Sequence, residues 1–404
     1  MKRYFATTVR GIEPMLVSEL QALGAKNVEA GTGGVHFEGD KALCYKANLW
    51  LRTALRVLEP VAELQVTSAE DLYRGALSVD WTKYITENDT LAVYANVRDN
   101  PALTHSKYAA LKTKDAICDF FRDRTSVRPS VDVDNPKLPL DLYISGPLAI
   151  ISIDTSGESL HRRGYRLARV EAPLRETLAA AIIAFSGWKG ETPFIDLMCG
   201  SGTLPIEAAL LATDHAPGLN RSFAFERAND FDAALWSKLK KEAEGRIKKS
   251  LPGGLIQGFD KDGQAIQTAK ENARRAGVLD LIEFRVQDLA QFAAPKEGPG
   301  VIVVNPPYGE RLGDEKKLES LYEKIGNTFK QKAQGYTGWV FTGNLRLAKT
   351  VGLRSARRIT LWNGPIESRL LEFELYAASR KSKYNEPRPE RPEGPTSGPY
   401  RSRS

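Results

Sequence analysis

From Leu174 onward, short apolar segments rich in β-branched residues alternate with longer amphipathic segments. This alternation is typical of a doubly wound α/β domain, in which helices cover both faces of a mostly parallel sheet. The predicted strands span residues 193–198, 255–260, 281–286, 301–305, 336–342, 358–362 and 370–376. The predicted helices span residues 174–187, 204–213, 262–277 and 315–333. We therefore expect a Rossmann-like α/β domain in this half of the chain.

Residues 1 to about 160 follow a different pattern, in which strand-like and helix-like segments predict an α+β arrangement with an antiparallel or mixed sheet. Residues 140–145 and 148–154 are joined through a Gly-Pro pair and predict a hairpin. Ser68 stands three residues before a carboxylate, which is the spacing of a helix N-terminal cap. The chain thus contains more than one folded unit, as its 404 residues also indicate.

The composition narrows the possible partners and compartments. A formal net charge of +7 favours a polyanionic partner without identifying it. The longest apolar run, Leu178 to Phe185, is too short to span a membrane, and the N-terminus does not have the pattern of a signal peptide, so we expect a cytoplasmic protein without a membrane partner. The three cysteines and four histidines are scattered and lack the spacing of ligand clusters, so we expect no metal site.

A glycine turn follows the first predicted strand of the α/β half. Its sequence is Phe194-Ile-Asp-Leu-Met-Cys-Gly-Ser-Gly-Thr203. Glycines allow a ligand to approach the backbone, and the start of the next helix attracts a carboxylate. Asp196 has the charge to meet an ammonium group, whereas Pro205 replaces the third glycine of a dinucleotide-binding fingerprint. A tight strand-to-helix turn without a ligand remains the alternative.

Carboxylates also end the next two strands. Asp260 has the position to accept hydrogen bonds from ribose hydroxyls, and Asp288 the position to bind the amine of an adenine. Acidic residues at strand ends more often cap the following helix, so each aspartate taken singly has that alternative. Asp262 in particular is expected to be such a cap.

The fourth strand leads into Asn305-Pro306-Pro307-Tyr308. Two prolines stiffen the turn, so that the Asn305 side-chain oxygen and the Pro306 carbonyl can accept both hydrogens of a planar amino group. Tyr308 offers a ring on which a base can stack. The element therefore predicts chemistry at an exocyclic base amine; a plain Pro-Pro turn is the alternative.

With these motifs the chain resembles the THUMP-containing, S-adenosylmethionine-dependent class I RNA methyltransferases. It is most similar to the guanine-N2 methyltransferase half of the bifunctional ribosomal RNA large subunit methyltransferase K/L group. The resemblance covers nearly all of residues 1–375. The second methyltransferase half of the bifunctional group is not expected in this chain. Further motifs that carry it are Phe5-Ala-Thr-Thr-Val-Arg-Gly11, Gly33-Gly-Val-His-Phe37, Glu171-Ala-Pro-Leu-Arg-Glu-Thr-Leu-Ala-Ala-Ala181 and Ala216-Pro-Gly-Leu219.

The resemblance implies a domain order and a set of site residues. It implies a ferredoxin-like domain at 1–55, a THUMP RNA-binding domain at 56–160 and a methyltransferase domain at 161–380, and we expect a disordered, basic, proline-rich tail at 381–404. The implied cofactor is S-adenosyl-L-methionine. The residues implied to hold it are Pro173, Leu174, Thr177, Asp196, Cys199, Gly200, Ser201, Gly202, Thr203, Asp260 and Asp288. The residues implied to hold the target base are Asn305, Pro306, Pro307 and Tyr308.

Basic residues near the domain junction predict contacts with structured RNA. Those on the helical segment 106–124 are Lys107, Lys112 and Lys114, and those in the hinge are Arg162, Arg163, Arg166 and Arg169. Such side chains bind phosphates without reading sequence. For the helical segment alone, a solvated face balanced by aspartates is an equal alternative.

The function expected from the resemblance is methylation of the N2 amine of a guanine in large-subunit ribosomal RNA, or in a particle that contains it. A tRNA guanine-N2 methyltransferase is the nearest alternative, and the Asn-Pro-Pro-Tyr element also serves adenine-N6 and protein glutamine methylation. An RNA-binding assembly factor with vestigial catalysis is the alternative of a different class.

Overall fold

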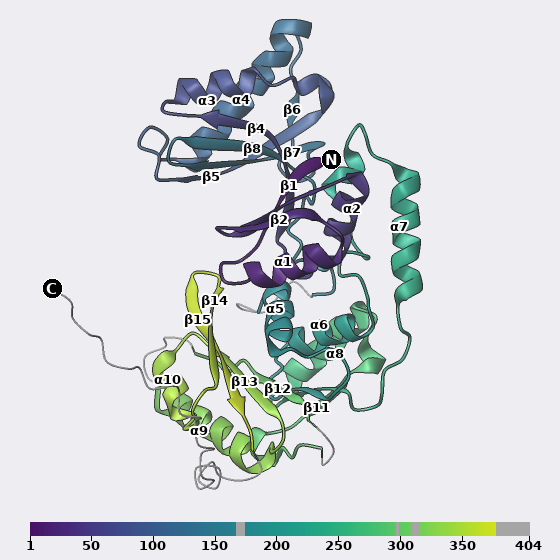
Figure 1. The fold of residues 1–404 in the computed structure, drawn as a ribbon, viewed down its shortest axis with the longest axis vertical. Helices are drawn as coiled ribbons and strands as arrows, with labels where there is room; N and C mark the ends of the chain where they lie inside the picture. The colour runs from purple at the N-terminus through teal and green to yellow at the C-terminus, as the bar shows by residue number, and fades with distance from the viewer. Residues whose placement is uncertain (167–173, 296–298, 309–314, 377–404) are drawn as a thin grey trace, which may run out of the picture.

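The computed structural model describes residues 1–166, 174–295, 299–308 and 315–376 (Figure 1). Two sheets, one of eight strands and one of seven, follow each other along the long axis of the molecule. In this described part, no helix combines the length and the apolar character that a membrane crossing requires. The expected combination of an α+β half and a Rossmann-like α/β half is confirmed.

The eight-stranded sheet belongs to the N-terminal half and has the order β2-β3-β1-β4-β8-β7-β5-β6. Its strands are β1 (Lys2–Thr7), β2 (Lys26–Gly31), β3 (Gly34–Gly39), β4 (Arg56–Gln65), β5 (Thr90–Arg98), β6 (Ser130–Val131), β7 (Leu138–Ser145) and β8 (Leu148–Asp154). The sheet is mixed, because β5 runs parallel to β6 and β7 while the other pairs are antiparallel. The β7–β8 hairpin is confirmed. β4 pairs with β1 on one side and with β8 on the other, so a single sheet runs past position 55.

Four helices cover this sheet: α1 (Glu13–Ala22), α2 (Lys41–Trp50), α3 (Ala69–Leu77) and α4 (Ser106–Thr125). Ser68 caps α3 as predicted, since its hydroxyl accepts a hydrogen bond from the Asp71 amide at 3.1 Å. Strand β2 was not predicted, because its sequence lacks apolar alternation and its residues are largely exposed at the sheet edge.

The seven-stranded sheet has the order β11-β10-β9-β12-β13-β15-β14. Its strands are β9 (Phe194–Asp196), β10 (Ile256–Asp260), β11 (Glu283–Val286), β12 (Val301–Val304), β13 (Thr337–Thr342), β14 (Arg357–Asn363) and β15 (Ile366–Glu374). Its helices are α5 (Glu176–Ser186), α6 (Thr203–Ala212), α7 (Ala233–Arg246), α8 (Gly263–Arg275), α9 (Glu315–Lys332) and α10 (Leu345–Thr350). All seven predicted strands are present, and β15 alone runs against its neighbours β13 and β14.

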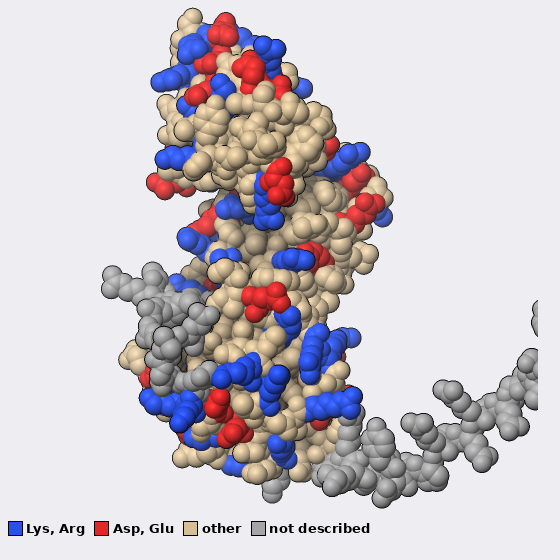
Figure 2. All heavy atoms as spheres, turned by 90° about the vertical axis from the view of Figure 1, so that its left-hand side faces the viewer, with Lys and Arg blue, Asp and Glu red and all other residues tan. Residues whose placement is uncertain are grey.

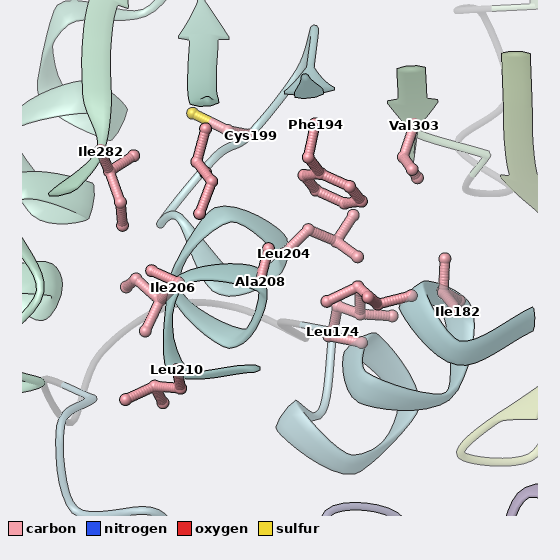
Figure 3. Close-up of a cluster of buried hydrophobic side chains, with 14 of the residues drawn as sticks. Leu174, Ile182, Phe194, Cys199, Leu204, Ile206, Ala208, Leu210, Ile282 and Val303 are labelled. Carbon is pink, nitrogen blue, oxygen red and sulfur yellow. The ribbon is translucent and has the colours of Figure 1, made fainter. Parts of the chain in front are cut away.

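A core of apolar side chains holds α5 and α6 against the centre of this sheet (Figure 3). Phe194 and Val303 project from neighbouring strands toward Leu204 of α6 and Ile182 of α5, and all four are buried. Full burial of such a side chain contributes about 1.5–3 kcal/mol. This packing fixes the carboxyl ends of β9 and β12, where the candidate site lies.

Helix α7 lies within the long connection between α6 and β10. It attaches the α/β half to the N-terminal unit, the part of the chain that contains the eight-stranded sheet and its helices. It runs beside α2 in Figure 1. Tyr45 of α2 stacks on Phe225 with ring centres 4.2 Å apart, and Trp236 of α7 meets both rings edge-on. Aromatic pairs of this kind add about 0.5–1.5 kcal/mol each to the burial of their surface. These rings form a packed junction between the N-terminal unit and the α/β half.

A second junction places the loop after β1 on the edge strand β14. Gly11 has a φ of +91°, and a Cβ built there would lie 2.5 Å from the carbonyl oxygen of Thr360. Arg10 lies with its guanidinium 5.1 Å from the ring centre of Trp362. Only glycine combines this backbone conformation with so close an approach.

We expect Gly11→Ala to lower the thermal midpoint of unfolding, because alanine adds both a strained φ and a clash with Thr360. Gly24→Ala is the matched control, since Gly24 has a φ of +85° but a Cβ added there would meet nothing within 4 Å. Strain alone costs about 1–3 kcal/mol, and the clash adds to it in Gly11→Ala only. Equal midpoints for the two variants would contradict the close contact.

Candidate active site

The candidate site lies where the strand order of the seven-stranded sheet reverses. β9 pairs with β10 on one side and with β12 on the other, and all three strands are parallel. Their carboxyl ends therefore meet at one edge of the sheet, with helices leaving toward opposite faces. Such a switch point is the common ligand-binding crevice of open α/β sheets. Asp196, Asp260 and Asn305 stand at these three strand ends.

The glycine turn after β9 has the conformation that its sequence predicted. Gly200 and Gly202 have φ values of +51° and +84°. A Cβ at Gly202 would lie 2.9 Å from that of Ala269 in α8, whereas one at Gly200 would meet nothing within 4 Å. Gly202 is thus needed for packing, and Gly200 leaves an open side toward which a ligand can approach the backbone.

The residues around the two glycines contribute mainly backbone to the site. The Cys199 side chain is buried in the core shown in Figure 3, and the Ser201 carbonyl accepts a hydrogen bond from Asn272 at 3.0 Å. Helix α6 begins at Thr203, and its N-cap residue Gly202 has no side chain to bind the first amides. Those amides are available to an anionic group.

Asp196 is a buried carboxyl group at this switch point. It is 1% exposed, and its Oδ1 accepts a hydrogen bond from the Met198 amide at 3.1 Å. Burial raises the pKa of Asp196 to about 8, and the negative charge of Asp260 adds to the effect. A cation bound beside it would reverse this shift, so the group is suited to a positively charged ligand.

Asp260 and Asp288 both have structural partners. The Asp260 carboxylate accepts hydrogen bonds from the Gly200 amide at 2.9 Å and the Asp262 amide at 3.0 Å. Asp288 is exposed and caps a short 3-10 turn through the Ala290 amide at 2.8 Å. Asp262 caps α8, as predicted. Asp260 thus ties the glycine turn to the end of β10.

The Asn305-Pro306-Pro307-Tyr308 element follows β12 directly. Asn305 Oδ1 is buried and has no hydrogen-bond partner within the described residues. A buried acceptor without a donor costs about 1–3 kcal/mol, so its presence points to a donor other than the residues that the structure describes. Pro306 is buried, and Pro307 is exposed.

Tyr308 is held in place from β13, β14 and the residue after β13. Its hydroxyl accepts a hydrogen bond from Asn363 Nδ2 at 2.8 Å. Its ring meets Phe341 edge-on, with centres 6.5 Å apart, and packs so closely on Gly343 that a Cβ there would lie 2.9 Å from the ring. Sequence reasoning missed Asn363 and Gly343, because both lie more than thirty residues from the motif they support.

Leu174 and helix α5 are linked to the start of α6, because Arg166 donates hydrogen bonds to the Leu174 carbonyl and to Thr203 Oγ1. Leu174 is buried, and Thr177 is fully buried with no partner for its Oγ1 among the described residues. Pro173 lies outside the described residues.

The structure corrects the prediction that Arg163 and Arg166 contact RNA. Arg163 is buried, donates to the carbonyls of Leu160 and Arg52, and lies 3.7 Å from Glu207. Arg166 donates to Glu176 at 2.9 Å, to the Leu174 carbonyl at 2.9 Å and to Thr203 Oγ1 at 3.0 Å. Their donors are therefore directed into the protein, where Arg166 joins α5 to the first residue of α6.

The other residues predicted to bind RNA lie on the surface or outside the described part. Arg162 is exposed and pairs with Glu158 at 2.6 Å. On α4, Lys107 is exposed, Lys112 lies over the Tyr73 ring and Lys114 pairs with Asp115. Arg169 is outside the described residues.

A buried group of charged side chains, also missed from the sequence, links the N-terminal unit to α6. Glu19 accepts hydrogen bonds from the Arg52 and Thr53 amides, and the Arg52 guanidinium donates to the carbonyls of Leu210 and His215. Burial raises the pKa of the Glu207 carboxyl, and Arg163 opposes this shift. Charges removed from water in this way are stable only while their partners remain.

Comparison with known proteins agrees with this geometry. Residues 163–372 match the family model described as "RMKL-like, methyltransferase domain". The chain belongs to the RMKL-like methyltransferases. Residues 3–58 match the model "RlmL ferredoxin-like domain", and residues 66–154 match the THUMP domain, so the predicted resemblance is confirmed.

Several relatives of this RMKL-like methyltransferase share most of its length. It is 43% identical over 383 residues to "Ribosomal RNA large subunit methyltransferase K/L" of Syntrophotalea carbinolica; the match covers 92% of the chain but only 53% of that relative. It is 41% identical to "Putative RNA methyltransferase slr0064" of Synechocystis sp., with 92% of the chain and 97% of the relative covered. The solved structure of SMU.472, complexed with SAH (S-adenosylhomocysteine), is similar with a TM-score of 0.83 and 32% identity, over 94% of this chain and 99% of that one.

We expect Arg163→Ala to destabilise the protein by about 3 kcal/mol, because it leaves the buried Glu207 carboxylate without its cation. Arg162→Ala is the matched control, since this neighbouring arginine is exposed and its ion pair contributes about 0–1 kcal/mol. Chemical denaturation of both variants measures the difference. If Arg163→Ala kept full stability and lost RNA affinity instead, the original prediction of a phosphate contact would be restored.

Proposed function

We propose that this RMKL-like methyltransferase transfers a methyl group from S-adenosyl-L-methionine to the exocyclic N2 amine of a guanine in large-subunit ribosomal RNA. The observation that carries the proposal is the buried Oδ1 of Asn305, which has no hydrogen-bond partner among the described residues and lies at the switch point that also holds Asp196. The name of the Syntrophotalea relative supports large-subunit ribosomal RNA as the substrate.

The crevice residues fit the cofactor. The buried Asp196 carboxyl suits the ammonium of the methionine part, and the open side of Gly200 with the first amides of α6 suits its carboxylate. Asp260 would bind the ribose hydroxyls and Asp288 the adenine. The Thr177 hydroxyl, which has no hydrogen-bond partner among the described residues, offers a further polar contact. The structure of SMU.472 with SAH supports this assignment. When bound, the cofactor supplies an electrophilic methyl group.

The base would be held by the Asn-Pro-Pro-Tyr element. Asn305 Oδ1 and the Pro306 carbonyl accept the two hydrogens of the amine, and this directs its lone pair at the methyl group. Tyr308, fixed by Asn363, stacks on the base. Asn305 is neutral and is not a strong base, so the chain contributes alignment and desolvation, and the excess proton leaves to solvent after transfer.

The N-terminal half would present structured RNA to this site. We propose a ferredoxin-like domain at 1–55, a THUMP domain at 56–160 and a methyltransferase domain at 161–380, in a protein located in the cytoplasm. Figure 2 shows that Lys and Arg gather over the lower half of one face, where the seven-stranded sheet lies, whereas basic and acidic side chains alternate at its upper end. Such a surface favours phosphate contacts near the catalytic domain.

A guanine must leave its stack to reach the crevice.

A strain that lacks the gene should lose one N2-methylguanosine from its large-subunit ribosomal RNA. The wild-type gene should restore this nucleoside, and the Asn305→Ala gene should not, because that variant lacks one acceptor for the amine. Liquid chromatography with mass spectrometry of nuclease-digested RNA measures both. Purified Asn305→Ala should bind SAH with an affinity close to that of the wild type.

Loss of N2-methylguanosine from tRNA alone would replace ribosomal RNA with tRNA as the substrate. Full methylation by Asn305→Ala would remove the proposed role of that side chain. Unchanged RNA modification in the deletion strain would favour an assembly factor without catalysis.

The affinity for SAH should rise with pH up to about 8. The Asp196 pKa of about 8 means that the neutral acid predominates below this value, whereas the ligand's ammonium requires the carboxylate. Each pH unit below 8 should therefore weaken binding by about tenfold, by proton linkage. Isothermal titration calorimetry between pH 6 and pH 9 measures this, and Asp196→Asn should bind weakly with no such slope. A flat wild-type profile would contradict the pairing of Asp196 with the ammonium.

A further inference from the structure

A groove between the N-terminal unit and β14 lies outside the crevice described above. Its two sides are the loops of the N-terminal unit around Arg10 and Thr32 and the outer side of β14 at Thr360 and Trp362. The groove is shallow and open to solvent, with a volume of about 690 Å³. Figure 1 shows the β14–β15 hairpin rising from the seven-stranded sheet toward the N-terminal unit. Neither the cofactor site nor the amine site uses these residues.

The groove and the residue that supports Tyr308 occupy adjacent positions on opposite sides of β14. Side chains alternate between the two sides of a strand, so Thr360 and Trp362 project to the groove, while Leu361 is buried in the core. Asn363, the next residue, donates the hydrogen bond that holds Tyr308. The wall of the groove is therefore rigidly connected to the ring on which the target base would stack.

The groove combines an aromatic surface with a cation. Trp362 is partly exposed, and the exposed Arg10 lies over its ring at 5.1 Å. No carboxylate of the described chain forms an ion pair with Arg10. Glu13, the acid that lines the groove, accepts hydrogen bonds from the amides of Gly11 and Gly33 at 2.6 and 3.2 Å.

We propose that this groove binds the RNA nucleotide that flanks the target guanine, with its base on the Trp362 ring and its phosphate at Arg10. Stacking on an aromatic side chain beside an arginine is the common way in which proteins bind unpaired nucleotides. The base takes the place that the Arg10 guanidinium occupies on the indole, and this exposed side chain turns to the phosphate. The inference rests on the proposed function, because it assumes an RNA strand that enters the crevice at the Asn305 edge.

The test measures binding and methylation of one probe, an unmodified in vitro transcript of the organism's large-subunit ribosomal RNA. Trp362→Ala should weaken equilibrium binding of the transcript and raise its KM by about 5-fold to 100-fold, which is the value of one stacked base. The KM for S-adenosylmethionine should not change. Trp362→Phe should recover most of the loss, because phenylalanine retains a stacking face. Arg10→Gln should weaken binding and reduce the slope of log affinity against log salt by about 1.

Arg246→Gln is the matched control, since Arg246 lies over Trp50 at 4.2 Å in the same kind of pair at the end of α7. It should leave transcript binding and the salt slope unchanged. Thermal midpoints of all variants show whether each one folds.

Unchanged transcript affinity in folded Trp362→Ala would overturn the inference. An increase in the KM for S-adenosylmethionine that Trp362→Phe does not reverse would also overturn it, because it would assign Trp362 a structural function. Failure of the wild type to methylate the transcript would count against the proposed function instead, and the binding measurements would still decide whether the groove holds RNA.

Discussion

The structure depends on the meeting of two parallel strand ends, β9 and β12, at the point where the sheet order reverses. β9 delivers a buried carboxyl group, and β12 delivers a buried amide oxygen that has no partner among the described residues. Neither group is favourable in an apolar interior by itself, since burial disfavours the charge of the first and leaves the second without a donor. The core beneath them, with Phe194, Val303 and Leu204, stabilises both positions. A cationic ligand and an amine donor would relieve the two costs together.

The N-terminal unit is connected to this site by three separate contacts. The aromatic side chains of α2 and α7 pack together, the half-buried Glu19 and Arg52 and the buried Glu207 cross the boundary, and Gly11 touches the edge of β14. Arg166 continues the charged group to Thr203 at the start of α6. An RNA held by the eight-stranded sheet would thus have a defined distance to the crevice. Such fixed positioning is what a reaction without a strong base requires.

Much of the fold could be predicted from the sequence, because its strands are apolar segments that are followed by glycine, proline or acidic residues. Period and composition located every strand of the α/β half, and the motif glycines stand where the backbone has positive φ. The continuous eight-stranded sheet could not be predicted, because β4 pairs with β1 near the start of the N-terminal half and with β8 near its end. Local charge indicated RNA contacts at Arg163 and Arg166. In the folded chain, however, Glu207 lies beside Arg163 and Glu176 beside Arg166, so these arginines pair inside the protein. The contact of Asn363 with Tyr308 could not be predicted either, because the two residues are 55 positions apart in the sequence.

A crystal structure of the protein with SAH tests the central claim most directly. The account predicts that the sulfur faces Asn305 Oδ1 across a gap that fits the methyl group carried by the sulfur and an amine nitrogen about 3–3.5 Å from that methyl carbon. The methionine ammonium should lie on the Asp196 carboxylate. A sulfur that points away from Asn305, or an Asn305 side chain that binds the protein's own backbone once the cofactor is present, would contradict the account.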